Sequence, residues 1–152
     1  MAIERDRPYS QFNFLVSWEG LDASDVKAGF QEISGLGLEI TVAEYRAGNF
    51  KDNAPMKITG TYKVPDITLK RGVIGATNLY QWLEEVRNGA EDALKDVTIE
   101  LLTQDRSDTA VKWELKNARP IKYTGPALNG KGTDVAIEEL VLSSERIVLE
   151  TA

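Results

Sequence analysis

The stretch Phe12-Asn13-Phe14-Leu15-Val16-Ser17-Trp18 carries the pattern that decides the fold class. Apolar side chains at every second position, with Asn13 and Ser17 between them, are typical of a β-strand that buries one face. The same alternation recurs over residues 38–42, 58–64, 97–101 and 111–115. We therefore expect a mainly β protein.

Further strands are expected over Val26–Ser34, Ile121–Thr124 and Ile147–Glu150. The segment Val135–Leu142 is ambiguous, because its adjacent glutamates and Leu140 would suit a helix while its three β-branched residues favour a strand. We expect a strand there. The apolar parity switches after Pro65-Asp66, which predicts a bulge or a corner in the sheet.

One helix is expected over about residues 77–88. Leu79, Trp82, Leu83 and Val86 follow the spacing of one helix face, Thr77 or Asn78 can cap its start, and Asn88-Gly89 can end it. The expected fold is a small β-sandwich or barrel with one flanking α-helix. At 152 residues the chain suits a single domain, spanning residues 1–152.

The composition limits the chemistry. Cysteine and histidine are both absent, so the chain offers no disulfide, thiolate or imidazole metal ligand, cysteine nucleophile or histidine-based triad. Eighteen basic residues against 24 acidic ones leave a net charge of −6, which argues against a general nucleic-acid binder. We expect no enzyme, no cofactor, no metal ion and no sequence-specific binding of nucleic acid.

Two glycine-rich segments resemble nucleotide-binding motifs only in part. Gly125–Gly132 matches G-x-x-x-x-G-K, but Gly132 stands where serine or threonine would ligate magnesium, and Pro126 removes a backbone N–H. We expect a turn there. The pair Gly35 and Gly37 lacks the third glycine of a dinucleotide fingerprint, and we expect a turn in which both glycines permit φ > 0.

Two other residue sets are better explained by structure than by chemistry. Adjacent carboxylates occur at 84–85, 91–92 and 138–139. Glycoside hydrolysis needs two carboxyl groups that converge across a cleft, whereas adjacent acids face different ways on a strand and usually mark the solvated side of a helix. The tryptophans at 18, 82 and 113 each lie on an apolar face, so we expect them to pack in the core.

No secretory signal is expected, because the first eight residues lack an apolar region. No apolar run approaches the roughly 20 residues of a membrane helix. We therefore expect assembly in a cytoplasm and no membrane anchoring.

The segment Glu44–Lys57 is long and polar for a connection, yet it contains two aromatic residues. Loops of this length are usually functional or disordered. It is either a contact loop or a plain flexible hairpin tip. The candidate contact residues are Glu44, Tyr45, Arg46, Gly48, Asn49, Phe50, Lys51, Asp52 and Asn53.

A series of short motifs, in order from about Pro8 to Glu150, resembles the tail tube proteins of contractile phage tails and phage-derived contractile injection systems. The motifs are Ala28-Gly-Phe-Gln-Glu-Ile-Ser-Gly-Leu36, followed by Glu39 and by Glu44-Tyr-Arg-Ala-Gly-Asn49, and then Lys57-Ile-Thr-Gly60, Ile67-Thr-Leu-Lys-Arg-Gly72, Leu79-Tyr-Gln-Trp82, Asn117-Ala-Arg-Pro-Ile-Lys122, Gly125-Pro126 and Val135-Ala-Ile-Glu138. The chain departs from the family's usual ending at 143–146, where a histidine-containing turn is more common.

The resemblance implies a β-barrel-like subunit with an external helix. Six copies would close into a ring, rings would stack into a hollow conduit for cargo, and the Glu44–Lys57 segment would reach the neighbouring ring. It further implies self-association, contacts with a sheath protein, baseplate and tape-measure proteins, and a place in a phage tail or tail-like particle. The alternative is a monomeric β-sandwich binding module, for example one that presents tryptophans to a carbohydrate.

The net charge adds a hypothesis about the conduit. Six copies would carry about −36 in total. If the acidic groups faced inward, the channel wall would repel polyanions.

Overall fold

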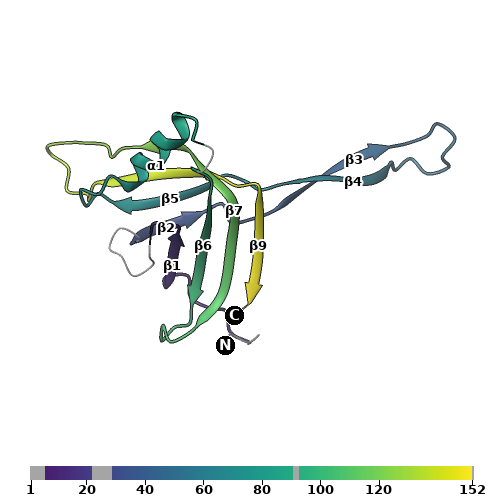
Figure 1. Ribbon diagram of the computed structural model, residues 1–152. Helices are drawn as coiled ribbons and strands as arrows, with labels where there is room; N and C mark the ends of the chain where they lie inside the picture. The colour runs from purple at the N-terminus through teal and green to yellow at the C-terminus, as the bar shows by residue number, and fades with distance from the viewer. Residues whose placement is uncertain (1–5, 22–28, 91–92, 152) are drawn as a thin grey trace.

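The computed structural model describes residues 6–21, 29–90 and 93–151. This part of the chain forms nine strands and one helix, whose arrangement is shown in Figure 1. In chain order they are β1 (Phe14–Trp18), β2 (Phe30–Ser34), β3 (Glu39–Tyr45), β4 (Met56–Lys63), β5 (Ile67–Gly72), α1 (Asn78–Arg87), β6 (Lys95–Leu102), β7 (Thr109–Thr124), β8 (Ile137–Ser143) and β9 (Arg146–Thr151).

The antiparallel strands form two layers that share β7. The first half of β7 pairs with β6 on one edge and β9 on the other, and β6 pairs with β1. The second half, residues 119–124, pairs with β8, and the sheet continues through β5 to β2. We call β1, β6, β9 and the first half of β7 sheet A, and β2, β5, β8 and the second half of β7 sheet B. The expected mainly β fold with one flanking helix is confirmed.

The bend between the layers corrects one prediction. Residues 121–124 are not a separate strand but continue the 111–115 strand as the 16-residue β7. Asn117, with φ of 52°, turns the backbone without ending the strand, because asparagine tolerates the left-handed region. The ambiguous segment at 135–142 forms the strand β8, as expected.

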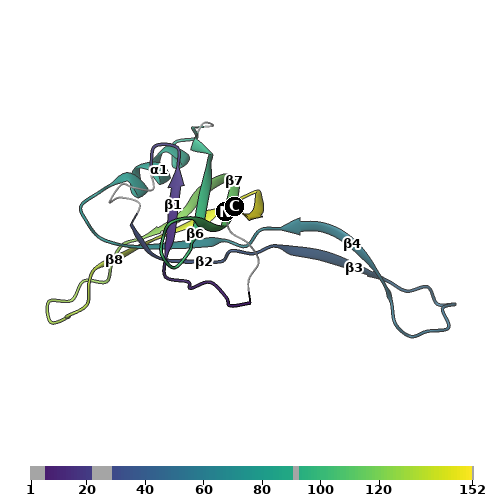
Figure 2. The same ribbon diagram turned by 90° about the horizontal axis from the view of Figure 1, so that it is seen from below.

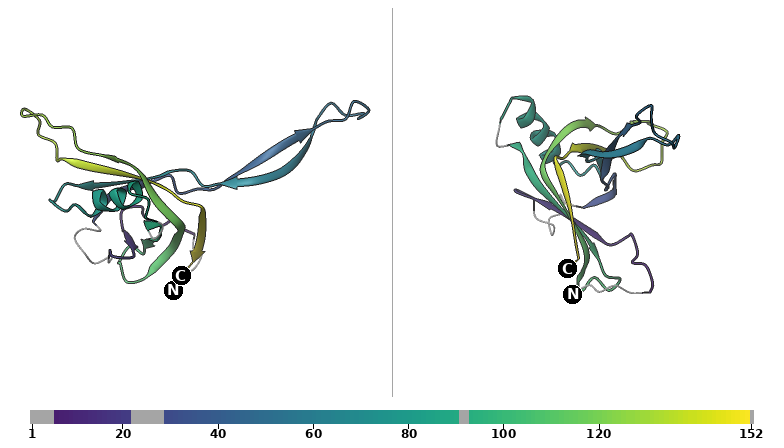
Figure 3. Two further views of the ribbon diagram at one scale, coloured as in Figure 1. Left: turned by 45° about the horizontal axis from the view of Figure 1, so that its top comes forward. Right: turned by 90° about the vertical axis from the view of Figure 1, so that its right-hand side faces the viewer.

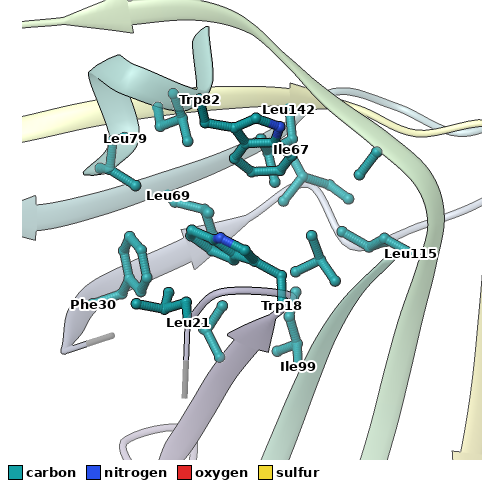
Figure 4. Close-up of a cluster of buried hydrophobic side chains, with 14 residues drawn as sticks. Trp18, Leu21, Phe30, Ile67, Leu69, Leu79, Trp82, Ile99, Leu115 and Leu142 are labelled. Carbon is teal, nitrogen blue, oxygen red and sulfur yellow. The ribbon is translucent and has the colours of Figure 1, made fainter. Parts of the chain in front are cut away.

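A core of aromatic and aliphatic side chains joins the two sheets and the helix (Figure 4). The rings of Trp18 and Trp82 lie 5.1 Å apart, and Leu79 on α1 is buried with them. The Trp82 indole N–H donates to the carbonyl oxygen of Ala93 at 2.6 Å. The helix runs from Asn78 to Arg87 with Asn88 as its C-cap, so the predicted helix is confirmed. Thr77 is the N-cap residue, but its side chain makes no capping hydrogen bond.

A polar network lies beneath the start of α1. The Arg71 guanidinium donates from Nε to Glu138 Oε1 at 2.8 Å and from Nη1 to Asn78 Oδ1 at 2.9 Å. The Tyr123 hydroxyl donates to the other carboxylate oxygen of Glu138 at 2.6 Å. The network therefore ties three strands of sheet B to the first turn of the helix.

Strand boundaries differ from the expected ones at several places. Phe12 precedes β1 and is 69% exposed, so it is not part of the buried strand face. β6 begins at Lys95, two residues before the alternation expected at 97–101. Of the expected strand Val26–Ser34, the structure places β2 at 30–34, and residues 26–28 lie outside the described residues.

The hairpin of β3 and β4 extends away from the two-layered body (Figures 1 and 2). The 125–136 connection between β7 and β8 projects on the opposite side of the body, as Figure 3 (left) also shows. The predicted corner at Pro65-Asp66 is confirmed, because β4 pairs only with β3 while β5, which follows, is central in sheet B.

Candidate assembly surface

The hairpin leaves the body at a glycine. Gly35, just after β2, has φ of 92°, and a Cβ atom built on it would lie 2.2 Å from the Asp66 carbonyl oxygen. Only glycine fits there, since both the conformation and the space exclude a side chain. Gly37 has no positive φ and open space around it, so the predicted need for φ > 0 applies to Gly35 alone.

The stem of the hairpin is exposed on both sides. Every residue of β3 and β4 is exposed, including Ile40 and Ile58 at 53% each. Alternate residues of a strand point to opposite faces, so Ile40 and Val42 share one face while Tyr45 lies on the other. In register, Ile40 lies opposite Tyr62, whereas Tyr45 lies opposite Met56. Each face of this two-stranded ribbon therefore carries an apolar patch.

The tip, residues 46–55, is held by its own side chains. Arg46 donates from Nε to the Asp52 carbonyl at 3.1 Å and from Nη2 to the Phe50 carbonyl at 3.3 Å. The Asp52 carboxylate accepts a hydrogen bond from the Ala54 N–H at 3.0 Å. The rings of Tyr45 and Phe50 meet edge to face, with centroids 6.3 Å apart. The tip is thus a defined shape and not a bare polar loop.

The structure redraws the boundaries of the predicted contact segment Glu44–Lys57. Glu44 and Tyr45 end β3, and Met56 and Lys57 begin β4, so only residues 46–55 are connecting loop. The alternation of β3 and β4 continues into both ends of the segment, which is why a count of polar residues overestimates the loop. Of the candidate residues, the structure brings together Tyr45, Arg46, Phe50 and Asp52, while Glu44 lies opposite Lys57. Gly48, Asn49, Lys51 and Asn53 lie exposed around the same tip.

Sequence reasoning missed the apolar stem. It expected a turn at Gly125–Gly132, and the structure places that segment in an exposed connection over 125–136. Leu128, in the 125–136 connection, is 85% exposed. The signal for the stem was present as alternating apolar residues, but alternation alone does not distinguish a face buried in the core from one left free. Gly60 was also missed as a structural residue: a Cβ there would lie 3.0 Å from the Thr41 carbonyl oxygen, beside the register shift of the hairpin.

Little else in the described residues suggests chemistry. A groove of about 630 Å³ opens beside β1 and β2, lined by residues that include Tyr9, Phe14, Ile33 and Trp113. Trp18 and Trp82 are buried in the core, as expected, and Trp113 packs against it. Across 6–21, 29–90 and 93–151, no cluster of acidic side chains could hold a metal ion. In the same ranges, no helix has the length and apolar character to cross a membrane.

Solved structures share this fold along the whole chain. A chain of the PVC sheath–tube complex, from an extracellular contractile injection system in its extended state, is 27% identical, with a TM-score of 0.82 over 97% of this chain and 94% of that one. The tube-terminating cap of the anti-feeding prophage is 26% identical, with a TM-score of 0.80 over 100% and 97%. Hcp1 from Flavobacterium johnsoniae, at 16% identity and a TM-score of 0.54 over 91% and 95%, shares the fold.

A family comparison gives the same answer from sequence. No curated protein sequence matches the chain. The family model for the T4-like virus tail tube protein gp19, however, matches residues 10–148. Members of that family are structural proteins, which supports neither an enzyme nor the alternative of a carbohydrate-binding module. The chain therefore belongs to the T4-like virus tail tube protein family and is a structural tube protein.

Proposed function

We propose that this protein closes into six-membered rings that stack into the inner tube of a contractile injection system, and that the β3–β4 hairpin makes the contact between rings. The single observation that carries the proposal is this hairpin, because its tip has a defined shape while every residue of its two strands is exposed in the described chain. Its hydrogen bond to the body runs from Arg146 Nε to the Tyr62 hydroxyl at 3.3 Å. A two-stranded ribbon is at best marginally stable alone in water. Its apolar faces therefore point to burial against another copy.

The tip supports the same assignment. An interface segment costs less to bind when its shape is already set, since less conformational freedom is lost on contact. Arg46 and Asp52 hold the tip in shape, and the aromatic pair of Tyr45 and Phe50 offers an apolar anchor. Aromatic residues are enriched at interfaces for this reason. The remaining tip residues, Glu44, Gly48, Asn49, Lys51 and Asn53, would surround that anchor.

A head-to-tail contact explains how one chain can build a tube. Such an interface closes into a ring when its rotation permits, and repetition along the axis then gives a filament. The hairpin and the 125–136 loop project in opposite directions, which suits a contact between unlike surfaces of successive copies (Figure 2). We place residues 1–152 in one tube domain.

The assemblies that contain similar chains suggest the other partners of this protein. Similar chains come from a sheath–tube complex, a sheath and tube terminator, and a baseplate. We therefore propose contacts with sheath and baseplate proteins, and with a tape-measure protein that sets length. The tube would assemble in the cytoplasm and act within a phage tail or a tail-like particle.

Electron microscopy of the purified protein in negative stain tests the proposal. We expect rings and tubes at high protein concentration. Persistent monomers would contradict it. Deletion of Gly48–Asn53 is expected to leave a folded chain that no longer stacks, and normal tubes from this variant would show that the tip is not the contact between rings.

Substitutions in the stem separate its role from that of the tip. Ile40→Glu and Ile58→Glu each place a charge on one face of the ribbon. Both side chains are exposed in the single chain, so we expect unfolding free energies within about 0.5 kcal/mol of wild type and a loss of tubes. The control Gln81→Glu adds the same charge on exposed α1 and should still assemble.

A further inference from the structure

Sheet B has one covered face and one free face. Buried residues of β5 and β8 alternate strictly with half-buried ones, and the buried set, such as Leu69 and Leu140, points toward sheet A and α1. The half-buried set lies on the opposite face of sheet B, pointing away from sheet A and α1. We call this set, with its register neighbours on β2 and β7, the free face: Glu32, Ser34, Thr68, Lys70, Gly72, Arg119, Lys122, Thr124, Ile137, Glu139, Val141 and Ser143.

Opposite charges lie next to one another on the free face. Lys70 is in register with Glu32 on one side and Glu139 on the other, and its Nζ lies 3.6 Å from the Glu32 carboxylate. Lys122 is an exposed base in the neighbouring row, beside Val141. The charges of these four side chains cancel. The fifth charged residue of the face, Arg119 in register with Ser143, lies 3.4 Å from the Glu145 carboxylate, which compensates it. The same pairing continues into the hairpin, where Glu39 lies opposite Lys63 and Glu44 opposite Lys57.

The net charge of the chain lies elsewhere. Residues 29–72 and 119–145, which form sheet B, the hairpin and the loop opposite it, contain nine acidic and nine basic residues. The rest of the chain, which includes α1 and most of sheet A, contains 15 acidic and nine basic residues. The entire net charge of −6 therefore comes from residues outside these two ranges.

The layered shape decides which side of sheet B would face inward in a ring. Sheet B ends at β2 on one edge and at residues 119–124 of β7 on the other, where backbone pairing among the described residues stops. Open edges invite pairing with another strand. If successive copies join at these edges, the thick layer of α1 and sheet A fits the longer outer circumference. The thin free face then lines the inner one.

We propose that the free face of sheet B is the channel wall of the assembled tube and that this wall carries no net charge. This inference rests on the proposed tube function and deepens it. It replaces the acidic wall suggested by the net charge of the whole chain. A wall of alternating opposite charges neither repels nor retains a strongly charged polymer, so it suits cargo that carries both signs, such as protein.

The absence of native cysteine permits a direct test. Thr68→Cys places one thiol on the free face, and Gln81→Cys places one on exposed α1 as the control. Assembled tubes, confirmed by microscopy, are treated with cationic and anionic methanethiosulfonates of similar size, and separately with a maleimide on a polymer too wide to enter the channel. We expect the small reagents to modify both variants and the polymer to modify only Gln81→Cys.

The ratio of cationic to anionic rate constants reports the potential at the wall. For Thr68→Cys we expect a ratio within about threefold of that for a free small thiol, whereas an acidic wall at a potential near the thermal energy would raise it about tenfold. Lys122 is in the same register row as Thr68. The double variant Thr68→Cys/Lys122→Glu is therefore a positive control, in which we expect a higher ratio than in Thr68→Cys alone. Val141→Cys serves if Thr68→Cys does not assemble.

The outcomes separate the two proposals. Tubes in which the polymer modifies Thr68→Cys, or in which neither small reagent does, would show that the free face is not the wall while leaving the tube function intact. A cationic preference near tenfold would overturn the neutral wall alone. Absence of tubes from the wild-type chain would overturn the proposed function itself.

Discussion

Arg71 donates from Nε and Nη2 to one carboxylate oxygen of Glu138, 67 residues further along the chain, and both side chains are buried. Neither charge could be buried at this depth alone, because desolvation of a lone ion costs several kcal/mol. The pair lies under the first turn of α1, where Arg71 also reaches Asn78. It therefore fixes the helix against sheet B in a way that the apolar core alone does not.

Removal of one partner is expected to be costly. Arg71→Met leaves Glu138 as a buried carboxylate without its cation, so we expect a loss of about 3–5 kcal/mol in the free energy of unfolding, measured by urea denaturation. The double variant Arg71→Met/Glu138→Leu removes both charges and should be more stable than the single one by about 2 kcal/mol. A double variant less stable than Arg71→Met would mean that Glu138 has a structural role independent of the arginine.

The hydroxyl of Tyr123 gives this network a dependence on pH. Its hydrogen bond to the Glu138 carboxylate, assisted by burial, raises the pKa of Tyr123 to about 12 from an ordinary value of 10.0. Because the folded state holds the proton more tightly, the resulting stabilisation is complete below pH 10 and is lost as the pH rises toward 12.

Comparison with Tyr123→Phe isolates this effect. We expect wild type to be more stable than the variant below pH 10, by about 1.5–3 kcal/mol for a hydrogen bond to a charged acceptor, and this difference to shrink between pH 10 and 12. Lysines and the other tyrosines are common to both proteins and cancel in the difference between the two unfolding curves. A difference that stays constant across this range would contradict the assigned cause.

The sequence predicts those features that depend on local pattern. A window of about ten residues is enough to predict the strand alternation, the helical spacing of α1 with its C-cap at Asn88, and the corner at Pro65-Asp66. The Arg71–Glu138 pair was not predictable, since a lysine- or arginine-containing strand usually turns its charge to solvent and the partner is distant in sequence. The free apolar stem of the hairpin was missed because its alternation matches that of a strand buried in the core.

Gly35 offers a test of the hairpin root. Gly35→Ala combines a strained φ of 92° with a Cβ that would overlap the Asp66 carbonyl oxygen, so we expect a loss of at least about 2 kcal/mol in unfolding free energy. Gly37→Ala is the matched control, because Gly37 has no positive φ and open space around it. We expect it to be neutral or slightly stabilising. Equal losses in the two variants would show that the close approach to Asp66 does not constrain the hairpin.

The hydrogen bonds of Arg46 give a last prediction, which separates order in the tip from its charge. Arg46→Ala removes two hydrogen bonds from the tip but none from the body, so we expect the global free energy of unfolding to change by less than about 1 kcal/mol. If the tip must be ordered before it binds the next ring, the two hydrogen bonds stabilise its binding conformation by about 1.4 kcal/mol. Their loss then raises the critical concentration for tube formation about tenfold. Sedimentation of tubes over a range of protein concentrations measures this value. Arg46→Lys keeps the charge but cannot bridge both carbonyls, so it should resemble Arg46→Ala, whereas wild-type assembly by Arg46→Lys would assign the role of Arg46 to its charge.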